Sequence, residues 1–455
     1  MSKMKIENAH QFYRDVFTKP INAIEDDGFS RLNIARGLNN KESILEILSS
    51  NHADVLHLIS ISNFFTDSYI GGNAPLELKN YVLLLAKEIS EKYKNDLIDI
   101  ICAKTLFRCS LVENFFDFIE SKPQIRNNHN IQIILALVFI FEEDYENAVS
   151  ILADLMSIPH YRNHFLFNVM SICAFYKCGG VPELPIDLTN IIQGVGAMPA
   201  GISWLTPMKK SEINFPIVFT ASDPIYFWNH ALFNFYSFAK LNSEGGYHFH
   251  LYNPDDNIVR KINSIKKEFK CFEISATSEI IPQGPFIKPA YTLNRFSAIH
   301  EVIRVKKNSI FSVDADSLWN GSIKDDFDGF DMAFCGSTYS PFWESNLGGV
   351  CFFGFNEKSD FFLSLMSKFS QTIKEKNQGI WFQDQIALKI CEETTSSNFD
   401  LKILRLDTDN WCDTEHKDES ILWQVTTRKD RPKYNFYKKQ IEEISKNLSK
   451  EKKLT

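Results

Sequence analysis

Residues 310–316 read Ile-Phe-Ser-Val-Asp-Ala-Asp, an apolar run that ends in Asp314 and Asp316 with one residue between them. A short apolar run of this kind predicts a buried strand, so both carboxylates are expected where that strand ends. Two carboxylates this close repel each other unless a cation lies between them. Oxygen ligands of this kind suit Mn²⁺ or Mg²⁺, and either ion can hold a diphosphate. The alternative is a solvated turn, because the pattern also arises by chance.

Strands and helices alternate on both sides of this stretch, from residue 215 onward. The predicted strands are residues 217–219, 247–252, 271–275, 309–313, 332–335 and 350–355. The predicted helices are residues 226–241, 258–269, 293–305, 361–374 and 380–391. This alternation predicts right-handed crossovers and a largely parallel α/β sheet. In such a sheet the ligand site lies at the carboxyl ends of the strands.

The chain before residue 179 has a different pattern, with apolar residues at helical spacing and few glycines or prolines. We therefore expect an all-helical domain over residues 1–178, a connector over 179–214, an α/β domain over 215–433 and a basic tail over 434–455. Residues 144–155 resemble the second half of a tetratricopeptide unit, but no clean unit precedes them. Stacked helical hairpins and a true repeat array both remain open.

The composition excludes several classes of protein. The chain has 455 residues, of which 44% are hydrophobic and 23% charged, so a large core is expected and global disorder is excluded. With 49 basic and 57 acidic residues, the net charge of −8 argues against a nucleic-acid-binding protein. The nine cysteines include no CxxC pair, which disfavours disulfides and structural zinc. The first residues lack a secretory signal, and the apolar run 131–141 is too short to span a bilayer, so we expect a cytoplasmic protein.

Three further segments place polar residues beside predicted strands or helix starts. Residues 219–226 (Phe-Thr-Ala-Ser-Asp-Pro-Ile-Tyr) end the first strand of the α/β region. Asp223 there can cap the following helix, or it can read a base edge with Tyr226 as a stacking face. Gly348 and Gly349 precede an apolar strand and suit either a tight turn or close approach of a ligand. Residues 383–385 (Gln-Asp-Gln) open a helix, where a helix cap is the alternative to a site.

Taken in order, these segments resemble a GT-A fold glycosyltransferase, in particular the family 8-like group that includes glycogenin and bacterial galactosyl- and glucosyltransferases. The resemblance covers residues 215–433 and implies a Rossmann-like, mostly parallel catalytic domain. It also implies a Mn²⁺ (or Mg²⁺) cofactor bound by Asp314 and Asp316, and a nucleotide-sugar donor. The other positions that match are the donor-binding Thr220, Ala221, Asp223, Tyr226, Arg295, Asn346, Gly348 and Gly349, and Asp384 and Gln385, which we take as the catalytic pair.

The C-terminal segment departs from the family pattern. The family has a His there as a third metal ligand, and Gln424 stands at that position. His416, eight residues earlier, is our candidate for the third ligand, and Lys429 or Arg431 could neutralise the diphosphate.

The predicted activity is transfer of a hexose from a nucleotide diphosphate sugar, with a UDP-sugar favoured, to a glycan, lipid-linked or protein acceptor. The resemblance implies retention of the anomeric configuration, although Asp384 could equally be the base of an inverting enzyme. A nucleotidyltransferase is a second interpretation, but the first strand is not followed by a Gly-rich basic loop. A helical adaptor with a degenerate transferase domain is the third.

Residues 428–455 contain ten lysines or arginines and four acidic residues. Within them Ile441, Ile444 and Leu448 form an apolar stripe. A helix of this kind can rest on an anionic membrane, at the inner face in a cytoplasmic protein, or pack against the catalytic domain. Packing against the catalytic domain is the favoured arrangement, because three apolar residues bury little area and alone give weak affinity for a membrane.

Overall fold

The computed structural model of the chain describes residues 54–68, 74–158, 165–179, 191, 193–213, 215–282, 284, 287–323, 327–336, 342–376, 382–425 and 432–451. The chain forms two compact units, Met1–Gly180 and Val181–Thr455. Among the described residues, no helix is long and apolar enough to cross a membrane.

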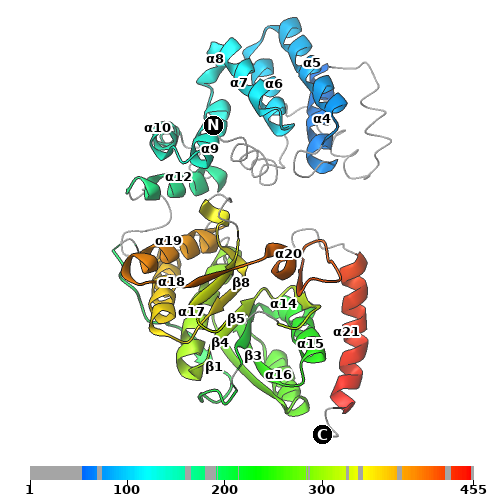
Figure 1. Ribbon diagram of the computed structural model, residues 1–455, viewed down its shortest axis with the longest axis vertical. Coiled ribbons are helices and arrows are strands. Elements are labelled where there is room, and N and C mark those ends of the chain that lie inside the picture. The colour runs from blue at the N-terminus through cyan, green and yellow to red at the C-terminus, as the bar shows by residue number, and fades with distance from the viewer. Residues whose placement is uncertain are drawn as a thin grey trace. The chain divides into compact units, whose positions relative to one another are not determined.

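The described part of the first unit consists of helices joined by short turns (Figure 1). Side-chain caps set several helix starts: Asn95, Asn128 and Asp144 each accept a hydrogen bond from a backbone amide of the first turn. The helices are α4 (Asp54–Ser68), α5 (Leu76–Tyr93), α6 (Asp96–Arg108), α7 (Val112–Ser121), α8 (Pro123–Arg126), α9 (His129–Phe141), α10 (Tyr145–Met156) and α12 (Phe165–Lys177).

Helix α9 contains the apolar run that the sequence analysis interpreted as a buried helix. Nearly every residue from Ile131 to Phe141 is buried, so α9 is covered on all sides by other helices. Helix α10 packs against it through Ala148, Leu152 and Leu155, all of which are buried. The small Ala148 fits the expected close approach of two helices, while a tetratricopeptide array stays a prediction.

The second unit contains a mostly parallel eight-stranded sheet with the order β1-β4-β3-β2-β5-β8-β7-β9. Strands β4, β3, β2 and β5 run parallel to one another, as do β7 and β9, whereas β8 is antiparallel to both of its neighbours and β1 is antiparallel to β4. Strands β6 and β10 form a separate antiparallel pair. The strands are β1 (Ile202–Trp204), β2 (Ile217–Ser222), β3 (Gly245–Tyr252), β4 (Phe272–Glu279), β5 (Ile310–Val313), β6 (Ser317–Trp319), β7 (Met332–Cys335), β8 (Leu347–Phe353), β9 (Ile403–Leu406) and β10 (Leu422–Gln424).

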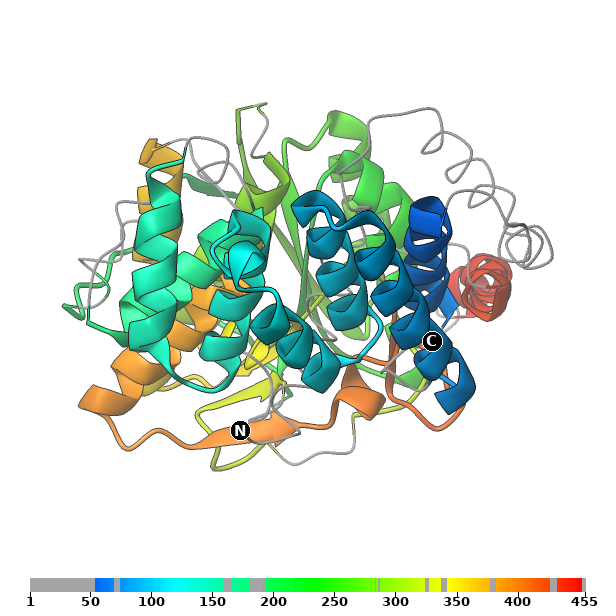
Figure 2. The same ribbon diagram turned by 90° about the horizontal axis from the view of Figure 1, so that it is seen from above.

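Helices cover both faces of this sheet, so the unit has the three-layer α/β arrangement expected from the alternating pattern (Figure 1). Helices α17, α18 and α19 lie on one face, and α15 and α16 lie on the other. Helix α21 runs along α15 (Figure 1, Figure 2). The helices are α14 (Pro224–Tyr226), the π-helix η2 (Phe227–Ala231), α15 (Leu232–Leu241), α16 (Asp256–Glu268), α17 (Ile287–Lys306), the 3₁₀-helix η3 (Phe342–Glu344), α18 (Glu357–Lys376), α19 (Gln383–Asn398), α20 (Thr408–Trp411) and α21 (Pro432–Glu451).

The core between the sheet and α15 is largely aromatic. Phe235 has four aromatic neighbours across the layer, with ring centroids between 5.0 and 5.9 Å away: Tyr247, Phe249, Phe269 and Phe272. Each fully buried side chain of this size contributes roughly 1.5–3 kcal/mol of transfer free energy. Several of the 39 phenylalanines of the chain therefore have a structural use in this layer.

The structure refines two predicted elements and adds strand β1 within the predicted connector 179–214. The helix expected over residues 226–241 is divided, because a π-helical turn over Phe227–Ala231 separates α14 from α15. The apolar stripe of the C-terminal tail is partly used in packing, since Ile441 is buried in the core of the second unit. Tyr434 and Tyr437 of α21 also donate hydrogen bonds to backbone carbonyls of residues 316 and 319. The packing arrangement of this helix is thus the one observed.

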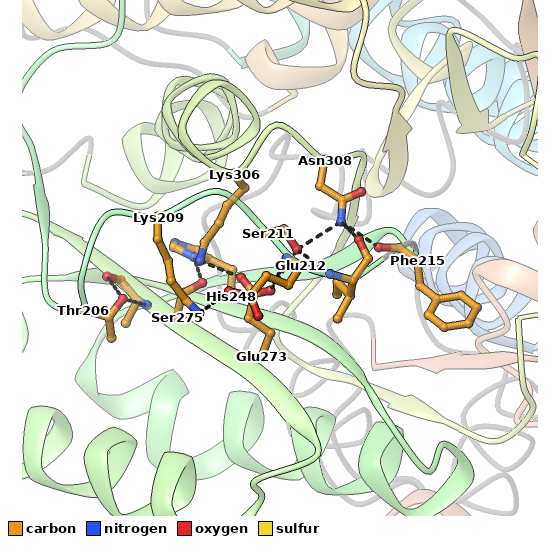
Figure 3. Close-up of polar contacts among 12 residues, drawn as sticks. Thr206, Lys209, Ser211, Glu212, Phe215, His248, Glu273, Ser275, Lys306 and Asn308 are labelled. Carbon is orange, nitrogen blue, oxygen red and sulfur yellow. Dashed lines mark hydrogen bonds and ion pairs between the residues drawn. The ribbon is translucent and has the colours of Figure 1, made fainter.

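Figure 3 shows a polar cluster at the amino edge of the sheet, where the segment before β2 is fastened. Glu273 accepts hydrogen bonds from Ser211 Oγ at 2.9 Å and from the buried Lys306 Nζ at 2.8 Å. The Asn308 amide donates to the carbonyls of Ile213 and Phe215 at 3.0 Å each. An open hollow of about 840 Å³ lies beside this cluster. It is at the opposite edge of the sheet from Asp314, so it is not the predicted site.

Candidate functional site

The end of β5 and the turn after it place Asp314 at the carboxyl edge of the sheet. Strand β5 runs parallel to β2, so Asp314 and Asp223 follow the ends of two neighbouring strands. The Asp314 amide donates to the Gly349 carbonyl at 2.8 Å, and the buried Asn234 side chain donates to the carbonyls of Asp314 at 3.4 Å and Ser317 at 3.0 Å. These bonds hold the turn without using the Asp314 carboxylate.

Arg295 connects this carboxylate to a second one on another element. From α17, its Nη1 donates to Asp314 Oδ1 and its Nη2 donates to Asp384 Oδ2 at 3.0 Å. The side chains of Arg295 and Asp384 are each 9% exposed, whereas that of Asp314 is 38% exposed. Asp314 is therefore the member of the cluster that a ligand can reach. The sequence analysis named all three residues, and the structure brings them into contact.

Burial and charge oppose each other in this cluster. Burial disfavours the charge of Arg295, but Asp314 and Asp384 outweigh it and raise the pKa of the guanidinium, which is permanently cationic. Burial raises the pKa of Asp384, and Asp314 adds to the effect, while Arg295 opposes it. The ion pair with Arg295 thus favours the charged form of this buried carboxylate at the start of α19, against the effect of burial.

Gly348 and Gly349 of β8 lie directly against the cluster. A Cβ on Gly348 would lie 2.6 Å from Nη2 of Arg295 and 2.8 Å from Oδ2 of Asp384. A Cβ on Gly349 would lie 2.8 Å from Nε2 of Gln424 and 3.0 Å from Oδ2 of Asp314. Both glycines therefore let side chains of the same chain come close to the backbone of β8, while close approach of a ligand stays a prediction.

Gln424 is the residue that the sequence analysis did not include among its candidates. It ends β10, whose pairing with β6 sets Gln424 opposite Ser317. Its Nε2 atom is buried and has no hydrogen-bond partner in the described part of the chain. The sequence did contain a signal for Gln424, because it stands where the resembling family has a ligand histidine. A polar side chain at that position can reach the same part of the site.

His416 has a different environment from the one predicted for a metal ligand. Its Nε2 lies 3.0 Å from the backbone carbonyl of Gln424, and its ring lies between those of Trp423 and Tyr434. Across the described residues, no three His, Cys, Asp or Glu side chains form a group that could hold a metal ion. The structure thus does not bring His416 together with Asp314 and Asp316. A backbone carbonyl and two aromatic rings instead fix the imidazole.

Asn346 is buried beneath the site and bonds to other residues. Its Nδ2 donates to Glu392 Oε2 at 2.6 Å, and its Oδ1 accepts from Arg405 Nη1. Arg405 and Lys389 also contact Glu392, at 2.8 and 3.0 Å. Asn346 therefore connects the start of β8 to the middle of α19 and to β9.

The segment at the end of β2 contains the helix cap that the sequence allowed. Asp223 Oδ1 accepts from the Tyr226 amide at 2.8 Å. Thr220 is fully buried and accepts from the Tyr247 hydroxyl at 3.4 Å, so it belongs to the core. Ala221 lies on β2 between them, and burial together with the Asp223 charge raises the pKa of nearby Tyr291. A role of these residues in binding a nucleotide stays a prediction.

The remaining candidates are divided between the site and undescribed segments. Gln385 lies in the first turn of α19, and its Oε1 is buried without a partner among the described residues. Asp316 lies in the turn between β5 and β6, where its carbonyl accepts from the Tyr434 hydroxyl at 3.2 Å. Lys429 and Arg431 lie outside the described residues.

No protein family and no curated protein matches the sequence. Among solved structures, the chain is similar to the glycosyltransferase GlyE of Streptococcus pneumoniae TIGR4, with a TM-score of 0.36 and 13% identity over 52% of this chain and 64% of that one. It is also similar to mouse xyloside xylosyltransferase 1 (TM-score 0.31, 11% identity, 48% of this chain and 99% of that one). A third is the bifunctional glycosyltransferase WbbM (TM-score 0.32, 12% identity, 75% and 62%). The chain spans less than two thirds of GlyE, so its function has to be argued from its own site.

Proposed function

We propose that the second unit is a metal-dependent glycosyltransferase that moves a hexose from a UDP-sugar to a glycan, lipid-linked or protein acceptor with retention of configuration. The observation that carries the proposal is the cluster of Arg295, Asp314 and Asp384, which lies at the carboxyl edge of a mostly parallel sheet. Ligands of such sheets bind at this edge. The order of the sequence segments that meet there is the order of the GT-A family 8-like pattern.

Charge arithmetic supports a divalent cation at this site. Asp314, Asp316 and Asp384 carry three negative charges and Arg295 one positive charge, which leaves −2 when all are ionised. A nucleotide diphosphate is itself anionic and is repelled by such a site unless a cation of charge +2 offsets it. The site therefore requires a cation before it can accept the donor.

The residues present fit such a cation. Mg²⁺ is usually held by one or two carboxylates together with substrate phosphates, so a complete protein cage is not needed. Asp314 and Asp316 would hold Mn²⁺ or Mg²⁺, and Arg295 binds only Oδ1 of Asp314, so Oδ2 is not used by that ion pair. When bound, the ion would offset the charge that develops on the departing diphosphate.

The chain's own residues would divide the remaining work. Arg295 fixes Asp314 through Oδ1 and leaves Oδ2 outside that ion pair. Asp384 is held by Arg295 in a buried position, where a carboxylate interacts strongly with positive charge that develops on a sugar ring. The buried, unpartnered Oε1 of Gln385 would accept a hydrogen bond from a sugar hydroxyl.

Binding and hydrolysis of donors test the proposal. The full chain should be stabilised in a thermal-shift assay by UDP with Mn²⁺ more than by UDP alone, and it should slowly release UDP from at least one UDP-sugar. Asp314→Asn and Asp316→Asn should abolish both effects. Asp256→Asn, a change to an exposed aspartate on α16, is the matched control. Release of pyrophosphate from nucleoside triphosphates would instead identify a nucleotidyltransferase, and binding of UDP by Asp314→Asn as tightly as by the unchanged chain would overturn the site.

A further inference from the structure

The hollow at the amino edge of the sheet has walls that are fixed by hydrogen bonds (Figure 3). The Asn308 amide donates to Ser211 Oγ at 3.2 Å and to the Ile213 carbonyl at 3.0 Å. The hydroxyl of Ser309, directly before β5, accepts from the Phe355 amide at 3.3 Å. These bonds connect the segment before β2 to β5 and to the end of β8. The hollow is therefore built before any ligand enters it.

The lining of this hollow is basic, although the chain as a whole carries a net charge of −8. Three lysines and one acidic residue line it: Lys209, Lys210, Lys307 and Glu212. The buried Lys306 adds no net charge, because it is paired with Glu273 at 2.8 Å. The lining thus carries +2, of which the carboxyl end of α17 offsets about half a charge. An anion is attracted to this part of the second unit.

Two of the three lysines have no acidic partner. Lys209 Nζ lies 3.4 Å from Glu212 Oε1, in an exposed pair that water screens. Neither Lys210 nor Lys307 forms an ion pair with another described residue, and both are exposed. Their ammonium groups can each donate charge-assisted hydrogen bonds to an anionic oxygen.

An exposed aromatic ring lies beside these ammonium groups. Phe355 lines the hollow and is 51% exposed, so its ring offers an apolar surface to a ligand. The volume of about 840 Å³ falls within the range of roughly 300–1,000 Å³ found for sites of small organic ligands. A sugar ring that carries a carboxylate combines the two parts that this lining matches, an apolar C–H face and an anionic group.

We propose that this hollow binds an anionic sugar chain, with its carboxylates at Lys210 and Lys307 and one ring against Phe355. The choice of a sugar chain over an acidic peptide rests on the proposed function, in which a glycan is one of the acceptors. Ser309 and Asp314 lie on either side of β5, so the hollow is about 17 Å from the candidate site at ~3.3 Å per residue. It is a second site, which holds a long acceptor and raises its effective concentration at the first.

Binding of tetragalacturonate to the full chain in EDTA tests this without metal or donor. Isothermal titration calorimetry should show binding that weakens with salt, and the neutral maltotetraose should not bind. Lys210→Gln combined with Lys307→Gln should weaken binding about tenfold or more, and Phe355→Ala about threefold or more. Lys87→Gln combined with Lys439→Gln is the matched control, because it removes the same charge at exposed positions on α5 and α21. It should bind as the unchanged chain does.

The outcomes separate this inference from the proposed function. If the Lys210 and Lys307 double variant binds as the control variant does, or if maltotetraose binds as tightly as tetragalacturonate, the inference is wrong. Equal binding of tetraglutamate would identify a site for acidic peptides and overturn the assignment to sugars. Displacement of tetragalacturonate by UDP with Mn²⁺ would move the ligand to the candidate site, which also overturns it. If the chain binds no UDP but the double variant alone loses tetragalacturonate, the proposed function fails and the second site stands.

Discussion

Gly348 and Gly349 are adjacent in β8 but lie against different side chains. Substitution of each glycine by alanine therefore tests a different contact. The new Cβ on Gly348 would lie within the ion pair of Arg295 and Asp384, at 2.6 and 2.8 Å from the nearest atoms. The new Cβ on Gly349 would lie 2.8 Å from Nε2 of Gln424 and 3.0 Å from Oδ2 of Asp314, the carboxylate proposed to hold the cation. Neither glycine has a positive φ, so alanine is not strained by the backbone at either position.

The expected magnitudes follow from what each Cβ would displace. Contacts of this kind are normally about 3.5 Å or longer, so Gly348→Ala has to move the guanidinium or the carboxylate by about 1 Å. Rupture of a buried ion pair costs about 3–5 kcal/mol, whereas overpacking costs about 1–3 kcal/mol. Arg295 keeps its contact with Asp314, so we expect a loss of about 2 kcal/mol, or about 4–8 °C in Tm.

Gly349→Ala should have the opposite profile. Its neighbours are the ends of two side chains, of which the Asp314 carboxylate is partly exposed and can move. The cost in folding free energy should stay below about 1 kcal/mol, but the new methyl group would displace Oδ2 of the carboxylate proposed to hold the cation. Mn²⁺ binding in the presence of UDP should weaken about tenfold or more, which corresponds to at least ~1.4 kcal/mol.

Two measurements decide the matter for both variants: the midpoint of urea unfolding without ligand, and the dissociation constant of Mn²⁺ with UDP. The reasoning requires a crossed result, with stability lost in Gly348→Ala and metal binding lost in Gly349→Ala. If Gly349→Ala is the less stable variant and binds Mn²⁺ as the unchanged chain does, the assignment of the two glycines to different partners is wrong.

Three other predictions follow from single contacts. Asn346→Ala should lower the free energy of unfolding by about 1–3 kcal/mol, measured in urea, while Mn²⁺ affinity changes less than about twofold; a large loss of affinity would place Asn346 in the site itself. Burial, His250 and Lys306 lower the pKa of the buried His248, so the unfolded chain takes up this proton first as the pH falls, and the free energy of unfolding should decrease below about pH 6.5. His248→Gln should flatten this pH dependence in urea titrations between about pH 5 and pH 7.5, and an unchanged slope would contradict the assignment. Termination of the chain before α21 removes Ile441 from the core and should lower Tm. If the full chain and the shortened chain sediment equally with anionic vesicles, a membrane role for this helix is excluded.

The sheet and the strand-end carboxylates were predictable because each depends on a local pattern. An apolar run that ends in Asp314 and Asp316 specifies a buried strand and its polar end with no information from elsewhere in the chain. The cap on Tyr226 from Asp223 is local in the same way, since three residues separate donor and acceptor. The π-helical turn that follows is not local, because it depends on how Phe227 packs against the sheet.

Asn346 and His416 have contacts that their local sequence patterns do not reveal. Asn346 takes its partners from residues 46 and 59 positions away, and these turn a residue of a binding motif into a buried support. His416 is only eight residues from Gln424, and its Nε2 lies 3.0 Å from the backbone carbonyl there, so its role as a metal ligand stays a prediction. A pattern can identify which residue types reach a site, but it cannot tell which atom of a residue is left free once the chain is folded.

The two oxygens of Asp314 explain how an arginine and a cation can share one carboxylate. Arg295 binds Oδ1 from the buried side, from α17, while Oδ2 faces Gly349 and Gln424. A cation on Oδ2 therefore does not have to displace the guanidinium, and the cost of desolvating Asp384 stays offset by Arg295 throughout. The same guanidinium also lowers the net negative charge that a single divalent ion must neutralise, from −3 to −2. Arg295 is thus a permanent counter-charge to both carboxylates, and this is the arrangement that would let one small divalent ion offset the remaining charge, as we propose.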